Sequence, residues 1–281
     1  MDEIAAKQVL LDFELIALIA LALGVMFYAA ARRWKRQEES LESVDYDGYD
    51  LILMFFPAVL FLMNPIVEGV MAASNKPIPI KEPENGISSV VMNLGYFAFV
   101  GIMTCGIVEW IRNRRVVDLF GLRRLSLPKI VVITILSGVA SLLICAWAVG
   151  DFSNSYLEGI FGDLEVQEPV KMFQDSSSNL HLALSVLLAC VAAPLVEEFL
   201  FRGYMYGTLR RLTNPVFAAI IIGALFAVVH GNLPALLPLW VFSILLCLAY
   251  ELTGCLWVSV GMHIFFNAAN IVLMLMPESA E

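Results

Sequence analysis

Long apolar stretches recur along the whole chain, and they constrain its fold more than any other feature. Eight segments are mostly apolar over about 20 residues, the length that a helix needs to cross the hydrocarbon core of a bilayer. They are residues 13–31, 51–72, 88–111, 129–149, 181–200, 215–230, 234–250 and 255–275. In lipid, backbone polar groups must be satisfied within the segment, so such stretches form helices. The sequence therefore predicts an all-α polytopic membrane protein with about eight transmembrane helices.

The composition supports a membrane protein and excludes other classes. Of the 281 residues, 60% are hydrophobic and 15% are charged, whereas a soluble domain is about half apolar and a quarter charged. The net charge of −9 has the wrong sign for neutralising nucleic-acid phosphates. All five cysteines lie in apolar runs without metal-site spacing, so we interpret them as small core residues. The expected partner is the bilayer, and no nucleic acid is expected.

The positive charges predict the orientation in the membrane. Thirteen of the 17 Lys and Arg residues cluster within three segments, at 32–36, 112–129 and 202–211. Because cytosolic loops carry an excess of Lys and Arg, these segments should face the cytosol and both termini should lie outside. We divide the chain into an N-terminal four-helix membrane region, residues 1–150, and a membrane core, residues 151–281. The first region contains a cytosolic linker at 32–50.

Two adjacent glutamates lie in the fifth predicted helix, in the sequence APLVEEFLFRGYMYG. Ionisable residues inside a span are costly and are functional-site hypotheses by default. Glu198 and Arg202 are four residues apart, so they share a helix face and can pair. The arginine would hold Glu198 as a carboxylate and leave Glu197 free to take up a proton. An ion pair at the end of the helix is the simpler alternative.

Two more polar pairs with the same spacing follow in the sixth and eighth predicted helices. Phe226 and His230 share one face, as do His263 and Asn267. Counting about 1.5 Å per residue from the expected turn at residues 213–215 places Glu198 and His230 at nearly the same depth. A hydrogen-bonded core histidine explains either pair alone. Their convergence predicts an active site among the last four helices, on a fifth helix that continues past Arg202.

Together the three motifs resemble the Rce1-like intramembrane proteases, the family of CAAX prenyl proteases and bacteriocin-processing or immunity proteins. The family pattern is EExxxR, FxxxH and HxxxN, in that order on successive spans. Here it reads Glu197-Glu198-Phe199-Leu200-Phe201-Arg202, Phe226-Ala227-Val228-Val229-His230 and His263-Ile264-Phe265-Phe266-Asn267. The resemblance covers about residues 180–275, with the motifs at 197–267, and assigns catalysis to region 151–281.

The resemblance also implies roles for these residues. Glu197 would be the general base, with His230 as its partner in activating water. His263 and Asn267 would stabilise the oxyanion, while Glu198 and Arg202 would position the site. The implied reaction is hydrolysis of a peptide bond in a membrane-associated protein or peptide, with or without a prenyl group. The motifs contain no serine or cysteine that could attack the peptide bond, so the nucleophile would be a water activated by a general base. No cofactor is expected.

Three alternatives remain at this point. In a zinc enzyme, Glu197, His230 and His263 would be the metal ligands. An immunity or scaffolding protein could keep the same fold without catalysis. A small transporter could relay protons through the same groups, although the broken helices and repeats typical of transporters are not evident. For the protease, we expect a multi-pass protein of the plasma membrane or, in a eukaryote, the endoplasmic reticulum, with its active site reached from the cytosol.

Overall fold

A computed structural model describes residues 46–61, 63, 86–145, 178–231 and 234–275. All regular secondary structure within these ranges is helical, so the protein is an all-α polytopic membrane protein. The predicted first span, 13–31, and most of the linker at 32–50 lie outside the described residues. Five of the described helices are long and apolar enough to cross a membrane, and two further apolar helices are shorter. The expected total of eight spans stays a prediction.

The helices follow the chain in this order: α2 (Gly48–Leu53), α4 (Ile87–Gly106), α5 (Val116–Leu119), α6 (Leu127–Leu142), α9 (Asn179–Leu187), α10 (Ala193–Glu198), α11 (Gly207–Leu212), α12 (Pro215–Val228), α13 (Leu236–Thr253) and α14 (Leu256–Leu275). Three π-helical segments join or extend them: η1 (Ile107–Ile111), η3 (Leu188–Ala192) and η4 (Phe199–Tyr206). Elements α9, η3, α10, η4 and α11 form one continuous helix of 34 residues, Asn179–Leu212. We refer to it as the long helix.

The ends of the long helix follow from local sequence. Its N-cap is Ser178, whose hydroxyl accepts a hydrogen bond from the backbone N–H of His181, as serine at this position often does. The helix ends at Leu212, and Asn214 caps the start of α12 by accepting from the N–H of Phe217. Pro215 occupies the first turn of α12, where its missing N–H does no harm. The predicted turn at 213–215 and the continuation past Arg202 are both confirmed.

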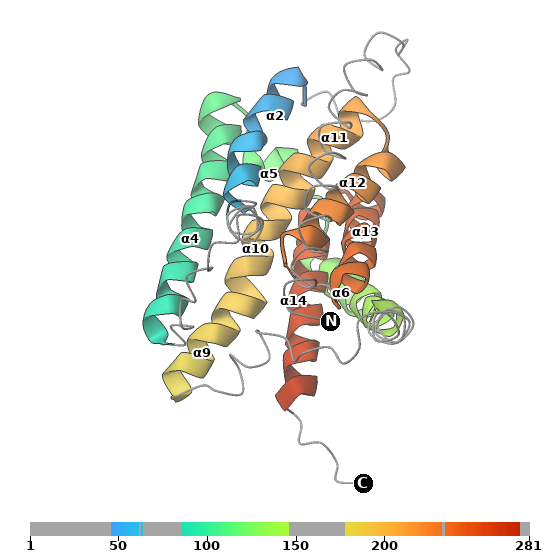
Figure 1. The fold of residues 1–281 in the computed structure, drawn as a ribbon. Coiled ribbons are helices and arrows are strands. Elements are labelled where there is room, and N and C mark those ends of the chain that lie inside the picture. The colour runs from blue at the N-terminus through green and yellow to red at the C-terminus, as the bar shows by residue number, and fades with distance from the viewer. Residues whose placement is uncertain (1–45, 62, 64–85, 146–177, 232–233, 276–281) are drawn as a thin grey trace, which may run out of the picture.

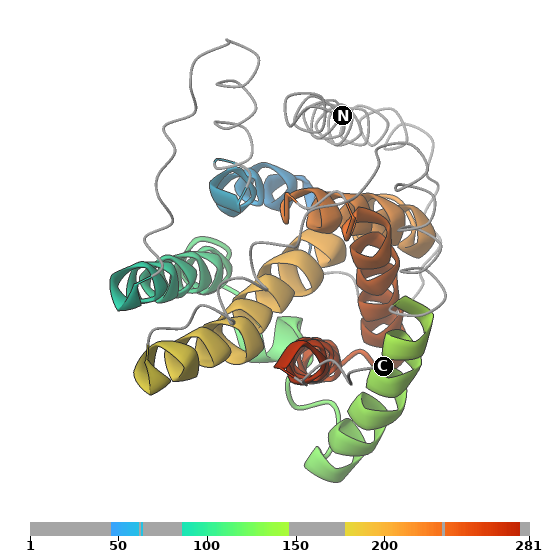
Figure 2. The same ribbon diagram turned by 60° about the horizontal axis from the view of Figure 1, so that its bottom comes forward.

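The long helix runs through the middle of the bundle. It lies between α4 and α2 on one side and α12, α13 and α14 on the other (Figure 1), and it contacts helices of both groups. Figure 2 shows it crossing the molecule with α4 and α6 on opposite sides. Its second half contributes the buried side chains of Phe201 and Tyr204 to the core, where Phe120, Phe226 and Phe242 of other elements are also completely buried.

Close helix packing places α14, which contributes His263. A Cβ atom on Gly138 of α6 would lie 2.7 Å from the ring of Phe265, and one on Gly261 of α14 would lie 2.6 Å from the hydroxyl of Thr134. Small residues at such contacts let membrane helices approach closely. The α6 helix therefore supports α14 from the side away from the long helix.

One predicted helix boundary differs from the structure. The sixth span was expected to cover 215–230, but α12 ends at Val228 and His230 lies in the turn that follows. The next residue, Gly231, has a φ of +58°, a left-handed conformation that glycine adopts without a steric penalty and that ends a helix. His230 therefore lies just beyond the C-terminal end of α12 and not within the helix.

Candidate active site

Glu198 is at the centre of the candidate site. Its Oε1 accepts a hydrogen bond of 2.7 Å from Nη1 of Arg202 and lies 2.9 Å from Nδ1 of His263. The side chains of Glu198 and Arg202 are both 0% exposed, so the pair is an internal one and not an interfacial ion pair. The predicted Glu198–Arg202 pairing is confirmed.

Arg202 is held from two further directions. Its Nη2 donates a hydrogen bond of 2.6 Å to Oγ of Ser243 on α13. The guanidinium carbon lies 4.3 Å from the centre of the Phe226 ring, a cation–π contact that strengthens when water is excluded. These contacts fix the guanidinium, and through it the carboxylate of Glu198.

His263 connects the two glutamates. A carboxylate accepts hydrogen bonds, so the ring donates from Nδ1 to Glu198 and turns its Nε2 atom toward Glu197. Nε2 lies 3.8 Å from Oε2 of Glu197, beyond a direct hydrogen bond but suited to a bridging water. The ring also packs edge-on against Phe226 and Phe242, with centroid distances of 5.7 and 5.5 Å.

Glu197 differs from Glu198 in its bonding. It is 7% exposed, and no hydrogen bond to its carboxylate is found among the described residues. The Oε2 atom of Glu198 is also buried without a partner there. Buried polar oxygens are nearly always hydrogen-bonded, to ordered water where protein groups are absent. The arrangement therefore leaves polar acceptors beside His263 where water would bind.

His230 reaches the site through Phe226. Its Nδ1 donates a hydrogen bond of 2.7 Å to the carbonyl oxygen of Phe226, which leaves Nε2 as the acceptor of a neutral ring. The rings of His230 and Phe226 are 4.6 Å apart, and the residue is exposed. Phe226 thus contacts His230, His263 and Arg202, and gives both imidazoles a shared aromatic wall. A direct hydrogen bond between His230 and Glu197 does not occur in the described part of the chain.

Asn267 lies one turn after His263 and makes an interhelical bond. Its Nδ2 donates a hydrogen bond of 2.8 Å to the carbonyl oxygen of Ala189, in η3 of the long helix. Side-chain amides often join membrane helices in this way. One of the two amide N–H groups is therefore used in holding α14 against the long helix.

Two contributors were not identified from the sequence. Ser243 holds the second terminal nitrogen of Arg202, and Phe242 contacts His263 and stacks on Phe266 at 4.0 Å. The available signal for Ser243 was a hydroxyl in the apolar helix α13, which also carries those of Tyr250 and Thr253. That signal does not say which neighbour the hydroxyl faces.

The described residues do not assemble the alternative zinc ligands. No group of three His, Cys, Asp or Glu side chains in these ranges is arranged to hold a metal ion. Glu197 and His263 are close, but His230 turns Nδ1 to the Phe226 carbonyl, and Glu198 is engaged by Arg202. We therefore derive no step through a metal.

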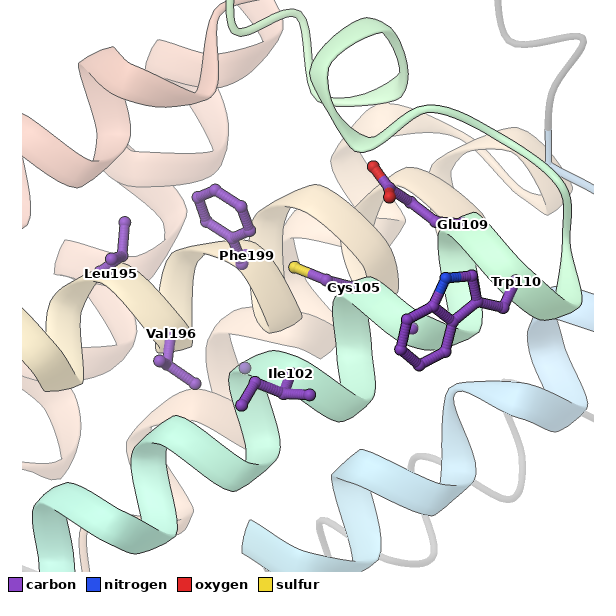
Figure 3. A pocket seen from close by; sticks show the side chains of 9 residues that line it. Ile102, Cys105, Glu109, Trp110, Leu195, Val196 and Phe199 are labelled. Atoms are coloured by element: carbon purple, nitrogen blue, oxygen red, sulfur yellow. The ribbon is translucent and has the colours of Figure 1, made fainter.

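A separate apolar pocket lies between α4–η1 and α10–η4. It has a volume of about 320 Å³, and its walls include Ile102 and Cys105 on one side and Leu195, Val196 and Phe199 on the other. Figure 3 shows Glu109 and Trp110 at one end of it. None of the predicted site residues lines this pocket, so it is distinct from the cluster around Glu198.

Comparisons with known proteins agree with the motifs. Residues 179–269 match the family described as Type II CAAX prenyl endopeptidase Rce1-like. The chain is also 29% identical over 140 residues to a Bacillus subtilis (strain 168) protein named "Putative membrane peptidase YdiL". The matched region is 47% of this chain and 57% of that relative. No solved structure matches the chain. The predicted resemblance is therefore confirmed for residues 179–269, which contain all three motifs and match the Rce1-like family.

Proposed function

We propose that the protein is an intramembrane endopeptidase in which Glu197 activates water to hydrolyse a peptide bond. The observation that carries the proposal is the unequal bonding of the two glutamates. Arg202 and His263 both hydrogen-bond to the carboxylate of Glu198. Glu197 is buried and receives no hydrogen bond from the described residues, and its Oε2 lies 3.8 Å from Nε2 of His263. A base must have a free oxygen to accept a proton, and Glu197 meets this requirement.

The proposed reaction needs no covalent intermediate with the enzyme. A water held between Glu197 and the imidazoles gives a proton to the Glu197 carboxylate while its oxygen attacks the carbonyl carbon. Glu197 then passes that proton to the amide nitrogen as the C–N bond breaks. Groups that are already fixed in a site shielded from bulk water can stabilise the charges of this reaction without the reorganisation that bulk water would need.

The other predicted residues have compatible roles. Nε2 of His230 is the acceptor that helps to orient the water, because its Nδ1 proton is used on the Phe226 carbonyl. The second N–H of the Asn267 amide remains for the oxyanion, together with Nε2 of His263 when that ring is doubly protonated. Glu198 and Arg202 hold His263 in place.

The proposed substrate is a membrane-associated protein or peptide, with or without a prenyl group. The name of the Bacillus subtilis relative specifies a membrane peptidase, which supports the substrate class without identifying a sequence. The positive-inside pattern supports entry from the cytosolic side, in a plasma membrane or an endoplasmic reticulum membrane.

The test compares Glu197→Gln with wild type and with a matched control, Glu109→Gln. Glutamine keeps the size of the side chain but accepts no proton from water. New peptide termini would be measured in membrane proteomes, and turnover of an identified substrate in liposomes. We expect Glu197→Gln to lower turnover by about 10²–10⁴-fold, and Glu109→Gln to keep it, because Glu109 lines the separate pocket.

A chelator arm tests the metal alternative. Wild-type turnover should persist in the presence of a strong chelator, and added zinc should not increase it. Loss of turnover with chelator and recovery with zinc would replace the glutamate mechanism by a zinc mechanism. Near-normal turnover by well-folded Glu197→Gln would refute Glu197 as the base.

A further inference from the structure

A second polar cluster ties the N-terminal helices to the long helix, close to the candidate site. We propose that Asp50 of α2, held by Arg112, positions Arg202 by anchoring Tyr204 in η4. This inference rests on the proposed function. Two of the residues to which it assigns a positioning role, Asp50 and Arg112, lie outside residues 179–269, the part of the chain that matches the family.

Asp50 is a buried carboxylate, with 2% of its surface exposed. It accepts hydrogen bonds of 2.8 Å from Nε and 3.2 Å from Nη2 of Arg112, which follows η1. The forked contact is the geometry in which arginine recognises a carboxylate most specifically. Oδ1 of Asp50 also accepts a hydrogen bond of 3.1 Å from the hydroxyl of Tyr204.

Neighbouring groups favour the charged forms of Arg112 and Asp47, the two groups that border Asp50. Burial opposes the charge of Arg112, but its hydrogen bonds to Asp50 and Asp47 raise the pKa of the guanidinium. Burial likewise opposes ionisation of Asp47, yet the N–H of Tyr49 and the guanidinium of Arg112 together hold the pKa of that carboxyl below its ordinary value. Arg112, which both aspartates contact, is therefore a charged partner that holds Asp50 in place.

Tyr204 connects this anchor with the site. It is completely buried and lies two residues after Arg202, in the same π-helical segment. A second bond supports that segment, because the hydroxyl of Tyr46 donates to the carbonyl oxygen of Gly203. Residues 203 and 204 are thus held from outside the long helix by Tyr46, just before α2, and by Asp50 in its first turn.

The π-helical geometry explains why such an anchor is needed. A π-helix is rare and occurs mostly as short insertions, frequently at functional sites. Here it must set the register of Arg202 so that one guanidinium contacts both Glu198 and Ser243. A shift of Arg202 would move Glu198, and then His263, whose Nε2 faces Glu197. Misplacement by about 1 Å can cost about 10²-fold in rate.

The decisive variant is Tyr204→Phe, which removes only the hydroxyl that contacts Asp50. We expect kcat to fall by about 10–100-fold, with KM within about twofold of wild type, because Tyr204 does not touch the substrate. The matched control is Tyr250→Phe on α13. Tyr250 is also buried, at 9% exposure, and its hydroxyl has no hydrogen bond within the described residues.

A spectroscopic readout tests the positioning without relying on turnover. The chain has only three histidines, so ¹⁵N labelling of histidine gives a small set of ring signals. Tyr204→Phe should shift the Nδ1 signal of His263, which reports its bond to Glu198, while the signals of His181 stay in place. Asp50→Asn should give the same pattern, and the double variant should add little to either single change.

The outcomes separate the inference from the proposed function. Unchanged His263 signals and unchanged kcat in folded Tyr204→Phe would overturn the positioning role. A kcat loss equal to that of Tyr250→Phe would overturn it as well. If Tyr204→Phe shifts the His263 signals but the wild-type protein cleaves no peptide, the positioning role is supported and the protease function is refuted. If Asp50→Asn does not fold, Tyr204→Phe alone decides.

Discussion

Removing the charge of Arg202 should destabilise the protein far more than removing the charge of Arg210, although both residues lie on the long helix. We chose Arg202→Met because an unbranched side chain fills much of the space and limits the effect of a cavity. Arg202 is 0% exposed and contacts Glu198, Ser243 and Phe226. The variant would leave the Glu198 carboxylate buried, with His263 as its remaining partner among the described residues.

The magnitude follows from that stranded charge. Breaking a buried ion pair by removing one partner costs about 3–5 kcal/mol. Neutralisation does not avoid the penalty, since protonating a free glutamate side chain at pH 7 costs about 3.7 kcal/mol. By contrast, Arg210 is 33% exposed and its partner Glu251 is 25% exposed. Partly solvated pairs of this kind contribute about 0–1 kcal/mol.

The assay is the free energy of unfolding, measured by SDS titration in mixed micelles for wild type, Arg202→Met and Arg210→Met. A third variant, Glu198→Gln with Arg202→Met, removes both charges together. Because replacing a whole buried pair is often close to neutral, the double variant should recover a substantial part of the stability lost in Arg202→Met. Equal losses for the Arg202 and Arg210 variants, or a double variant that is no more stable than Arg202→Met, would refute the reasoning.

Three further outcomes are expected. Ser243→Ala should cost about 1–3 kcal/mol of unfolding free energy, because it leaves the buried Nη2 of Arg202 with only a long contact of 3.5 Å to the Ser243 carbonyl oxygen among the described residues; an unchanged free energy of unfolding would contradict this. Gly207→Ala should destabilise the protein, since a Cβ there would lie 2.6 Å from the Tyr46 side chain, whereas Gly95→Ala in α4 meets no atom within 4 Å and should gain about 0.5–1 kcal/mol from helix propensity; the same sign for both changes would contradict this. Single cysteines introduced at positions 3 and 279 should be labelled from outside intact cells, and protection of both would reverse the topology predicted from the positive charges.

The sequence by itself determined the features that depend on local spacing. Apolar length predicted an all-helical membrane fold, and the turn between the long helix and α12 followed from Asn214 and Pro215. The four-residue separation of Glu198 and Arg202 predicted their pairing, because residues at this distance share a helix face. The three motifs in order predicted the match to the Rce1-like family that residues 179–269 show.

Only the tertiary structure decided which helix faces supply the partners. His263 contacts Glu198 across 65 positions, Asn267 contacts Ala189 across 78, and Tyr204 contacts Asp50 across 154. No periodicity encodes these contacts. In a bilayer, lipid tails and neighbouring helices are equally apolar, so hydropathy does not indicate which face of a span meets protein. The π-helical segments add a further reason, because each alters the register of every side chain that follows it on the long helix, and only packing and hydrogen bonding to other helices select where they form.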